Sequence, residues 1–424
     1  MGITLFAAFV VLLLIGVPIA VSLGAASMIA LLLFGHTPVM VLVQKTFSGI
    51  DSFTLLAIPL FILAGNIMST GGVSRRLVAL ANCGFGRYPG GLAQVLTAAC
   101  TFFGAISGSA PATAAAIGSV MIRPMIQRGY PVEFAAACTA ASGVIGLLIP
   151  PSITMVVYGV VTGTSIGKLF LSGIIPGLIM SAALMTANYI TAKKWNCGKE
   201  APPAPGESGK AFKEAIWALF MPIIILGGIY GGIFTPTESA AVAAAYGLFV
   251  GKFIYKELTW KDLLDVAAQT TKSSAVLMFL VATAHCFSYM MASEQIPEAI
   301  ANLLLSLSRN PTALLALICV VLLIVGTFLD NVIAMLLLAP IFFPVITEVG
   351  IDGVYFGLIM VLGLCIGQVT PPVGTTLFVA CNISGISLER LSANIGIYLL
   401  MMILVLALMV ACPALVMVIP NNMM

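Results

Sequence analysis

Long stretches without a charged side chain constrain this chain more than any other feature of its sequence. Charge-free runs include 1–44, 88–122, 134–167, 169–192 and 353–388. A helix that crosses the hydrocarbon core of a bilayer needs about 20 apolar residues. Only 8% of the residues are charged, against about 25% in soluble domains. The sequence therefore predicts an all-α polytopic membrane protein, and its small net charge of +3 argues against a nucleic-acid partner.

Several of these runs are too long for one membrane crossing and are interrupted by Gly and Pro. Irregular backbone at membrane depth is tolerated only where it is buried in protein or lines a wet cavity. Residues 88–122 lie between Arg87 and Arg123, so we expect a re-entrant hairpin that enters and leaves on one face. Its centre contains Ser109 and Pro111, which suit the start of a returning helix.

The two halves of the chain resemble each other. The sequence IGLLIPP at 145–151 matches IGQVTPP at 366–372, an offset of 221 residues. Residues 74–133 carry five arginines and one acid, whereas 293–352 carry five acids and one base. Cytoplasmic loops are enriched in Lys and Arg, so equivalent loops are expected on opposite faces, as in an inverted-topology repeat.

We expect the following organisation. Repeat 1 (1–192) comprises scaffold helices in 1–87, hairpin 1 at 88–125, a broken helix at 133–165 and a closing helix at 169–192. A cytoplasmic linker follows at 193–214. Repeat 2 (215–424) comprises scaffold helices in 215–308, hairpin 2 at 310–347, a broken helix at 353–386 and a closing helix at 391–418. Segment 3–34, with Gly16 and Pro18, forms either one kinked span or two short ones.

Each Pro-Pro pair breaks a helix at the same point of its repeat. Proline has no N–H, so the carbonyl four residues earlier loses its helical partner. The carbonyls expected to be freed are those of Gly146, Leu147, Gly367 and Gln368. Clusters of such carbonyls with nearby hydroxyls suit a hard cation such as sodium.

The tip of hairpin 2 is expected at Asp330 and Asn331, which align with Ser109 and Ala110 at the same offset. Asp330 could be only a helix N-cap. A carboxylate at membrane depth is costly, however, so a functional role is the favoured interpretation.

Four segments together resemble the large membrane subunit of tripartite ATP-independent periplasmic (TRAP) transporters. They are SGSAPATAAAIG at 107–118, GVIGLLIPPS at 143–152, TPTESAA at 235–241 and GQVTPPVG at 367–374. The resemblance implies an elevator-type fold and sodium-driven import of a small organic acid, such as sialic acid or a C4-dicarboxylate. It implies no cofactor beyond the coupling sodium ions. It also implies a bacterial inner-membrane location, a separate small four-helix membrane subunit and a periplasmic binding protein.

The resemblance also implies where the ligands bind. Substrate is expected between the hairpin tips, at Ser107, Ser109, Thr113, Asp330, Asn331 and Thr375. Sodium is expected at Ser107, Gly108, Ser109, Gly143, Gly146, Leu147, Pro150, Gly326, Thr327, Asp330, Gly367, Gln368 and Thr370.

Three other functions are weighed against this one. A stand-alone sodium/carboxylate symporter would share the architecture and differ in needing no binding protein. An intramembrane enzyme could use Ser107 or Ser109 as nucleophile, but no His or Lys lies nearby in the sequence as a base. A channel would need a lined pore, and inverted repeats favour alternating access instead. We therefore do not expect an enzyme.

Overall fold

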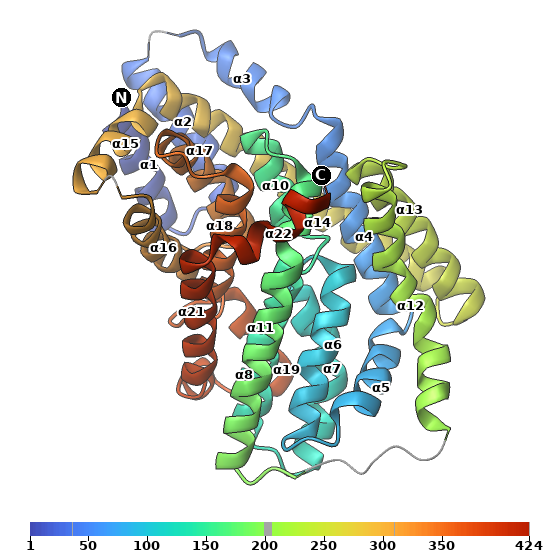
Figure 1. The fold of residues 1–424 in the computed structure, drawn as a ribbon. Helices are drawn as coiled ribbons and strands as arrows, with labels where there is room; N and C mark the ends of the chain where they lie inside the picture. Colours follow the sequence, from blue (N-terminus) through green and yellow to red (C-terminus); the bar gives the residue numbers. More distant parts are fainter. Residues whose placement is uncertain (36, 199–205, 309, 424) are drawn as a thin grey trace.

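The computed structural model describes residues 1–423 except 36, 199–205 and 309, and in these residues it contains helices and no strand (Figure 1). Six helical segments are long and apolar enough to cross a membrane. Two further helix pairs would each make a span if the pair is counted as one bent helix. The prediction of an all-α polytopic membrane protein is confirmed.

The N-terminal segment forms two short helices rather than one kinked span. The turn between them contains Gly16, whose φ of +84° is the left-handed conformation that glycine adopts readily. The first elements are α1 (Gly2–Leu14), α2 (Ile19–Phe34), α3 (Val39–Ser48), η1 (Phe53–Leu56), α4 (Ala57–Thr70) and α5 (Val73–Phe85).

The rest of the first half contains a helical hairpin, a broken helix and a long helix. Its elements are α6 (Gly91–Ser107), α7 (Ala110–Gln127), α8 (Val132–Gly143), α9 (Ile145–Leu148), α10 (Ile153–Thr162) and α11 (Ile166–Lys194). The axis bends by 41° between the α8–α9 segment and α10, where the first Pro-Pro pair stands.

The second half begins at α12, earlier than expected. The linker between α11 and α12 is therefore shorter than the expected 193–214. Residues 199–205 of this linker lie outside the described part of the chain. Its elements are α12 (Glu207–Tyr230), α13 (Pro236–Phe249), η2 (Val250–Ile254), α14 (Trp260–Ser293), α15 (Ile296–Leu307), α16 (Pro311–Phe328), α17 (Asn331–Glu348), α18 (Gly353–Gly367), α19 (Thr375–Ser384), α20 (Leu388–Ser392), α21 (Gly396–Ala411) and α22 (Pro413–Met423).

The expected closing helix at 391–418 is wrong. The structure has α20, α21 and α22 there, with a bend of 61° between α21 and α22. The cause of the bend is Pro413, which cannot donate to the carbonyl of Met409. The hydroxyl of Tyr355 lies 3.1 Å from that carbonyl oxygen and donates to it instead.

Helices from the two halves pack against each other reciprocally. The return helix of the first hairpin, α7, packs on α19, and the return helix of the second, α17, packs on α10. Figure 1 shows α6, α7, α8 and α19 gathered at one end of the molecule. Elsewhere α4 packs against α13 and α14, and α14 also contacts α2 and α3.

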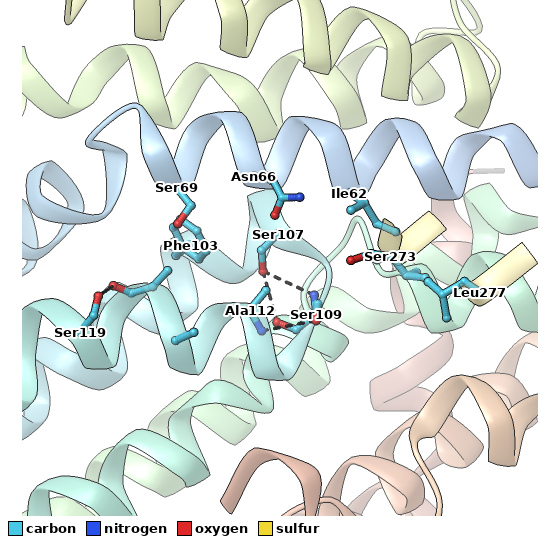
Figure 2. A pocket seen from close by; sticks show the side chains of 14 residues that line it. Ile62, Asn66, Ser69, Phe103, Ser107, Ser109, Ala112, Ser119, Ser273 and Leu277 are labelled. Atoms are coloured by element: carbon cyan, nitrogen blue, oxygen red, sulfur yellow. Dashed lines mark hydrogen bonds between the residues drawn. The ribbon is translucent and has the colours of Figure 1, made fainter. Parts of the chain in front are cut away.

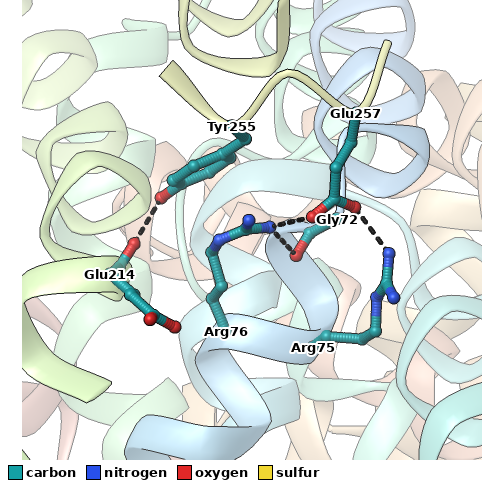
Figure 3. Close-up of polar contacts among 6 residues, drawn as sticks. All are labelled: Gly72, Arg75, Arg76, Glu214, Tyr255 and Glu257. Carbon is teal, nitrogen blue, oxygen red and sulfur yellow. Dashed lines mark hydrogen bonds and ion pairs between the residues drawn. The ribbon is translucent and has the colours of Figure 1, made fainter. Parts of the chain in front are cut away.

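An ion cluster fastens the start of α5 to the segment that precedes α14 (Figure 3). One carboxylate oxygen of Glu257 lies 2.5 Å from a guanidinium nitrogen of Arg75, and the other lies 2.8 Å from a guanidinium nitrogen of Arg76. The guanidinium of Arg76 also stacks 3.7 Å from the centre of the Tyr255 ring. The hydroxyl of Tyr255 donates to the carbonyl of Glu214 on α12 at 2.7 Å. The two arginines therefore hold helices together within the protein.

A buried chain of hydrogen bonds joins α6, α8 and α11 to α21. The Asn188 amide nitrogen donates to the hydroxyl of Thr97 at 2.7 Å, and Thr97 lies 2.7 Å from the hydroxyl of Ser142. The hydroxyl of Tyr398 donates to the Asn188 carbonyl oxygen at 2.7 Å. All four side chains are buried, and the contacts satisfy polar groups that would otherwise be costly in a core.

Candidate functional site

The tip of the first hairpin is a tight turn attached to the break in the neighbouring helix. Helix α6 ends at Ser107, Gly108 has a φ of +63°, and Ser109 is the N-cap of α7. The Gly108 carbonyl accepts the N–H of Ile153 at 3.3 Å. A side chain at Gly108 would bring its Cβ within 2.7 Å of the Pro151 carbonyl oxygen. Glycine is therefore required for this close approach.

The hydroxyls at this tip turn toward each other and toward the broken helix. The side chain of Ser107 lies 2.6 Å from the hydroxyl of Thr113, one turn into α7. Both residues are buried. Thr113 also lies directly over Gly146, where an added Cβ would collide with its hydroxyl. The predicted residues Ser107, Thr113 and Gly146 are thus neighbours in space.

The second hairpin places its carboxylate at the same point of the turn. Asp330 is the N-cap of α17, and its Oδ1 accepts the N–H of Val332 at 3.0 Å. Its Oδ2 accepts the side-chain amide of Gln368 at 3.0 Å, so the tip is bonded to the second broken helix. Asn331 beside it donates to the sulfur of Cys365 at 3.6 Å. Asp330 is therefore a cap and also a member of a buried polar cluster.

In both halves a glycine of the hairpin lies against a glycine of the broken helix. A Cβ on Gly104 would stand 2.9 Å from the Cα of Gly146. A Cβ on Gly326 would stand 3.2 Å from the Cα of Gly367. Side chains would hold these backbones apart, so the glycine pairs bring each hairpin close to the break in its helix.

Buried polar side-chain atoms without a hydrogen-bond partner gather at the two breaks. Among the described residues ten such atoms occur, and six of them lie at the breaks: Ser152 Oγ, Thr154 Oγ1, Asn331 Oδ1, Gln368 Oε1, Thr375 Oγ1 and Thr376 Oγ1. Leaving such an atom unsatisfied costs about 1–3 kcal/mol. Six oxygens clustered in this way point to bound ligands that complete their contacts. Sequence reasoning gave no site role to Ser152 or Thr154.

The expectation of free carbonyls at the second break is wrong. The Gly367 carbonyl accepts the N–H of Thr370 at 2.9 Å, and the Gln368 carbonyl accepts the N–H of Thr376 at 3.3 Å. The chain turns back at the prolines and brings new donors to both oxygens. Each carbonyl has two lone pairs, so one acceptor position remains for an ion. Thr370 also donates its hydroxyl to the Ile366 carbonyl at 2.8 Å.

Two adjoining cavities lie between the hairpin tips and the helices α4 and α14. The first, of about 420 Å³, lies over the tip of the first hairpin and is shown in Figure 2, where Asn66 of α4 faces Ser107. The second, of about 570 Å³, reaches both tips and is lined by Ser109, Asp330 and Asn331. Thr113 and Thr375 line neither cavity.

The wall formed by α4 and α14 was missed by sequence reasoning. It contributes Asn66 to the first cavity, Lys272 to the second and Ser273 to both. The signal for Lys272 was present, because it is the only charged residue between Asp265 and Glu294.

The atoms around the cavities that could bind a cation are oxygens. Among the residues that the structure describes, no group of three His, Cys, Asp or Glu side chains could hold a metal ion. Hydroxyls, carbonyls and one carboxylate form the type of site that hard cations prefer.

Comparison with known proteins gives the same family as the sequence motifs. Residues 6–415 match the family described as the tripartite ATP-independent periplasmic transporter, DctM component. The isethionate TRAP transporter permease protein DctMQ of Oleidesulfovibrio alaskensis is 45% identical over 97% of this chain, which spans 65% of that protein's length. The C4-dicarboxylate TRAP transporter large permease protein DctM of Pseudomonas aeruginosa is 43% identical, with 94% of each protein covered.

A further relative is named for a different organic acid. The sialic acid TRAP transporter large permease protein SiaM of Vibrio cholerae is 39% identical over 97% of this chain and 96% of its own. Among solved structures, the YdaH transporter of Alcanivorax borkumensis has a similar fold, with a TM-score of 0.64, 16% identity, and coverage of 87% of this chain and 86% of that one. The relatives are named as transporter permeases and not as enzymes. The chain therefore belongs to the DctM component family of tripartite ATP-independent periplasmic transporters.

Proposed function

We propose that this chain imports a small organic acid across a bacterial inner membrane, driven by sodium, as the large subunit of a binding-protein-dependent TRAP system. The observation that carries the proposal is the group of six buried oxygens at the two helix breaks that have no hydrogen-bond partner among the described residues, beside a cavity that reaches both hairpin tips. Relatives named for isethionate, C4-dicarboxylate and sialic acid support an organic acid as the substrate.

Sodium would bind once in each half. The first site would use Ser107, Gly108 and Ser109 from the hairpin tip, with atoms from the segment between Gly143 and Pro150. The second would use Gly326, Thr327 and Asp330 from the hairpin, with the segment from Gly367 to Thr370. The glycine pairs support this assignment because they bring hairpin and break within backbone contact in each half.

The substrate would lie between the hairpin tips. Helices α7 and α17 begin at this space. A helix N-terminus carries partial positive charge that favours an anion. The cavity of about 570 Å³ has the size of a small-molecule site. Ser109 and Asn331 would contact the substrate's polar groups, while Asp330 would face a sodium ion.

The two halves would form inverted repeats, and the hairpins and broken helices would move together as an elevator. The reciprocal packing of α7 on α19 and α17 on α10 supports this view, because the return helix of each hairpin packs against the broken helix of the other half. Such repeats place the binding site at their interface in many secondary transporters.

The substitution Asp330→Asn tests the proposal. It preserves shape and the ability to cap α17, so a purely structural cap predicts near-normal transport. Removal of a charged ligand costs about 1.5–3 kcal/mol, which reduces sodium-driven uptake in proteoliposomes tenfold or more. The matched control is Asp352→Asn, because Asp352 caps α18 in the same way, at 2.8 and 3.0 Å, but is exposed. Equal, near-wild-type uptake in both variants would return Asp330 to a structural role.

Reconstitution tests the partners. The 65% coverage of the relative named DctMQ leaves a third of that protein unmatched, which is consistent with a small membrane subunit joined to it. We expect accumulation of substrate only when a small membrane subunit and a periplasmic binding protein are added to this chain. Full uptake by the chain alone would favour a stand-alone symporter.

A further inference from the structure

One of the two lysines of α14, Lys272, lines the space between the hairpin tips. Lys272 lines the larger cavity together with Asp330 and Asn331, although these residues belong to distant parts of the chain. Lys272 is exposed, and within the described residues it makes no ion pair. Within the described part of the chain its charge therefore has no partner on this wall of the cavity.

The helix that carries this lysine is fixed to its neighbour. Two residues before Lys272, the hydroxyl of Thr270 accepts a hydrogen bond of 3.0 Å from the side-chain amide of Asn66 on α4. Next to it, Ser273 and Leu277 line both cavities, and Figure 2 shows them to the right of Ser109. Residues i and i+4 share a helix face, so Lys272 and Val276 extend this lining surface.

The hairpin tips and the broken helices supply acceptors and negative charge to the same cavity. Asp330 contributes a carboxylate, and the unpartnered oxygens of Asn331, Gln368 and Thr154 belong to residues lining the same cavity. The Asp330 carboxylate would repel an organic acid in this space until a sodium ion neutralised it. A cation that lines the same cavity would offset that repulsion.

Resting on the function proposed above, we propose that Lys272 is a specificity-determining residue: it contacts the anionic group of the bound organic acid from α14 while the hairpin tips hold the other side. The substrate then bridges the two walls of the cavity. A second carboxylate on the substrate gains more from this lysine than a single acidic group does, so Lys272 favours dianions.

Two other roles would give different results. A lysine can extend its amine to lipid headgroups, in which case Lys272 would not affect substrate binding. A direct ion pair with Asp330 would make its removal a change in stability, with no dependence on substrate charge.

The test measures binding directly on the full purified chain. A ligand that binds the folded state raises the unfolding midpoint as its concentration increases. The probes are succinate, a dianion, and isethionate, a monoanion, each titrated in sodium buffer. The variants are Lys272→Gln and Lys272→Arg. The matched control is Lys261→Gln, in the first turn of the same helix, exposed and lining neither cavity.

We expect Lys272→Gln to raise the succinate concentration for half-maximal stabilisation about fivefold, the effect of an exposed charge contact of about 1 kcal/mol. The increase should be smaller for isethionate, and Lys272→Arg and Lys261→Gln should stay within about twofold of wild type. Unchanged titrations for Lys272→Gln would overturn the role of the lysine. So would equal losses for both acids. A wild-type chain stabilised by neither acid nor by N-acetylneuraminate would overturn the proposed substrate class itself.

Discussion

The glycine pair between the first hairpin and its broken helix gives a prediction whose sign follows from geometry. In Gly104→Ala the new Cβ would stand 2.9 Å from the Cα and 3.2 Å from the N of Gly146. Both atoms are backbone, so no flexible side chain can move aside. Overpacking of this kind typically costs about 1–3 kcal/mol. We expect a lower unfolding midpoint in detergent, with protein still inserted in the membrane.

The same displacement should weaken the sodium site. To relieve the contact, α6 and the break at Gly146 must separate by a few tenths of an ångström, which moves the proposed ligands on the two elements apart. A misplaced ligand set binds a cation less tightly, so the sodium concentration for half-maximal uptake should rise by about fivefold or more. Sodium titration of uptake in proteoliposomes measures this change.

A matched substitution should act in the opposite direction. Gly227 lies in α12, and an added Cβ there would meet no atom within 4 Å. Gly227→Ala should therefore stabilise the protein by about 0.4–1 kcal/mol, chiefly by restricting the unfolded chain. If Gly104→Ala matched Gly227→Ala in midpoint and sodium dependence, the steric reasoning about the pair would be refuted.

Two further predictions concern the joined halves and their orientation. Tyr398→Phe removes the only donor that the structure gives to the buried oxygen of Asn188 among the described residues, so it should lower the free energy of unfolding by about 1–3 kcal/mol; an unchanged unfolding midpoint would contradict this. In a Cys-free background, a membrane-impermeant thiol reagent added from outside should label Glu348→Cys and not Arg87→Cys, because their loops carry opposite charge; the reverse pattern would rule out the proposed orientation.

Local signals in the sequence predicted the helix starts at the hairpin tips. Ser109 and Asp330 both act as N-caps, since capping depends on bonds that reach only two or three residues along the chain. The long uncharged runs likewise predicted a membrane protein, because a helix that crosses a bilayer needs about 20 apolar residues.

Features that depend on distant contacts escaped prediction. The bend after α21 is stabilised by Tyr355, which lies 54 residues before Met409 in the sequence. The Gly367 carbonyl regained a partner because the chain turns back at the second Pro-Pro pair. Lys272 could not be placed in the site without knowing that α14 faces the hairpin tips. In each case the deciding partner is set by tertiary packing and not by spacing along one helix.

The bond between Tyr398 and Asn188 also has a consequence for how the protein is made. The two residues are 210 positions apart, so Asn188 enters the membrane well before Tyr398 has been synthesised. During that interval the amide oxygen of Asn188 lies in an apolar setting without its donor, which disfavours a finished first half. The packing of α6, α8 and α11 is therefore less stable until α21 arrives. A first half made without α21 should accordingly be less stable than the same helices in the complete chain.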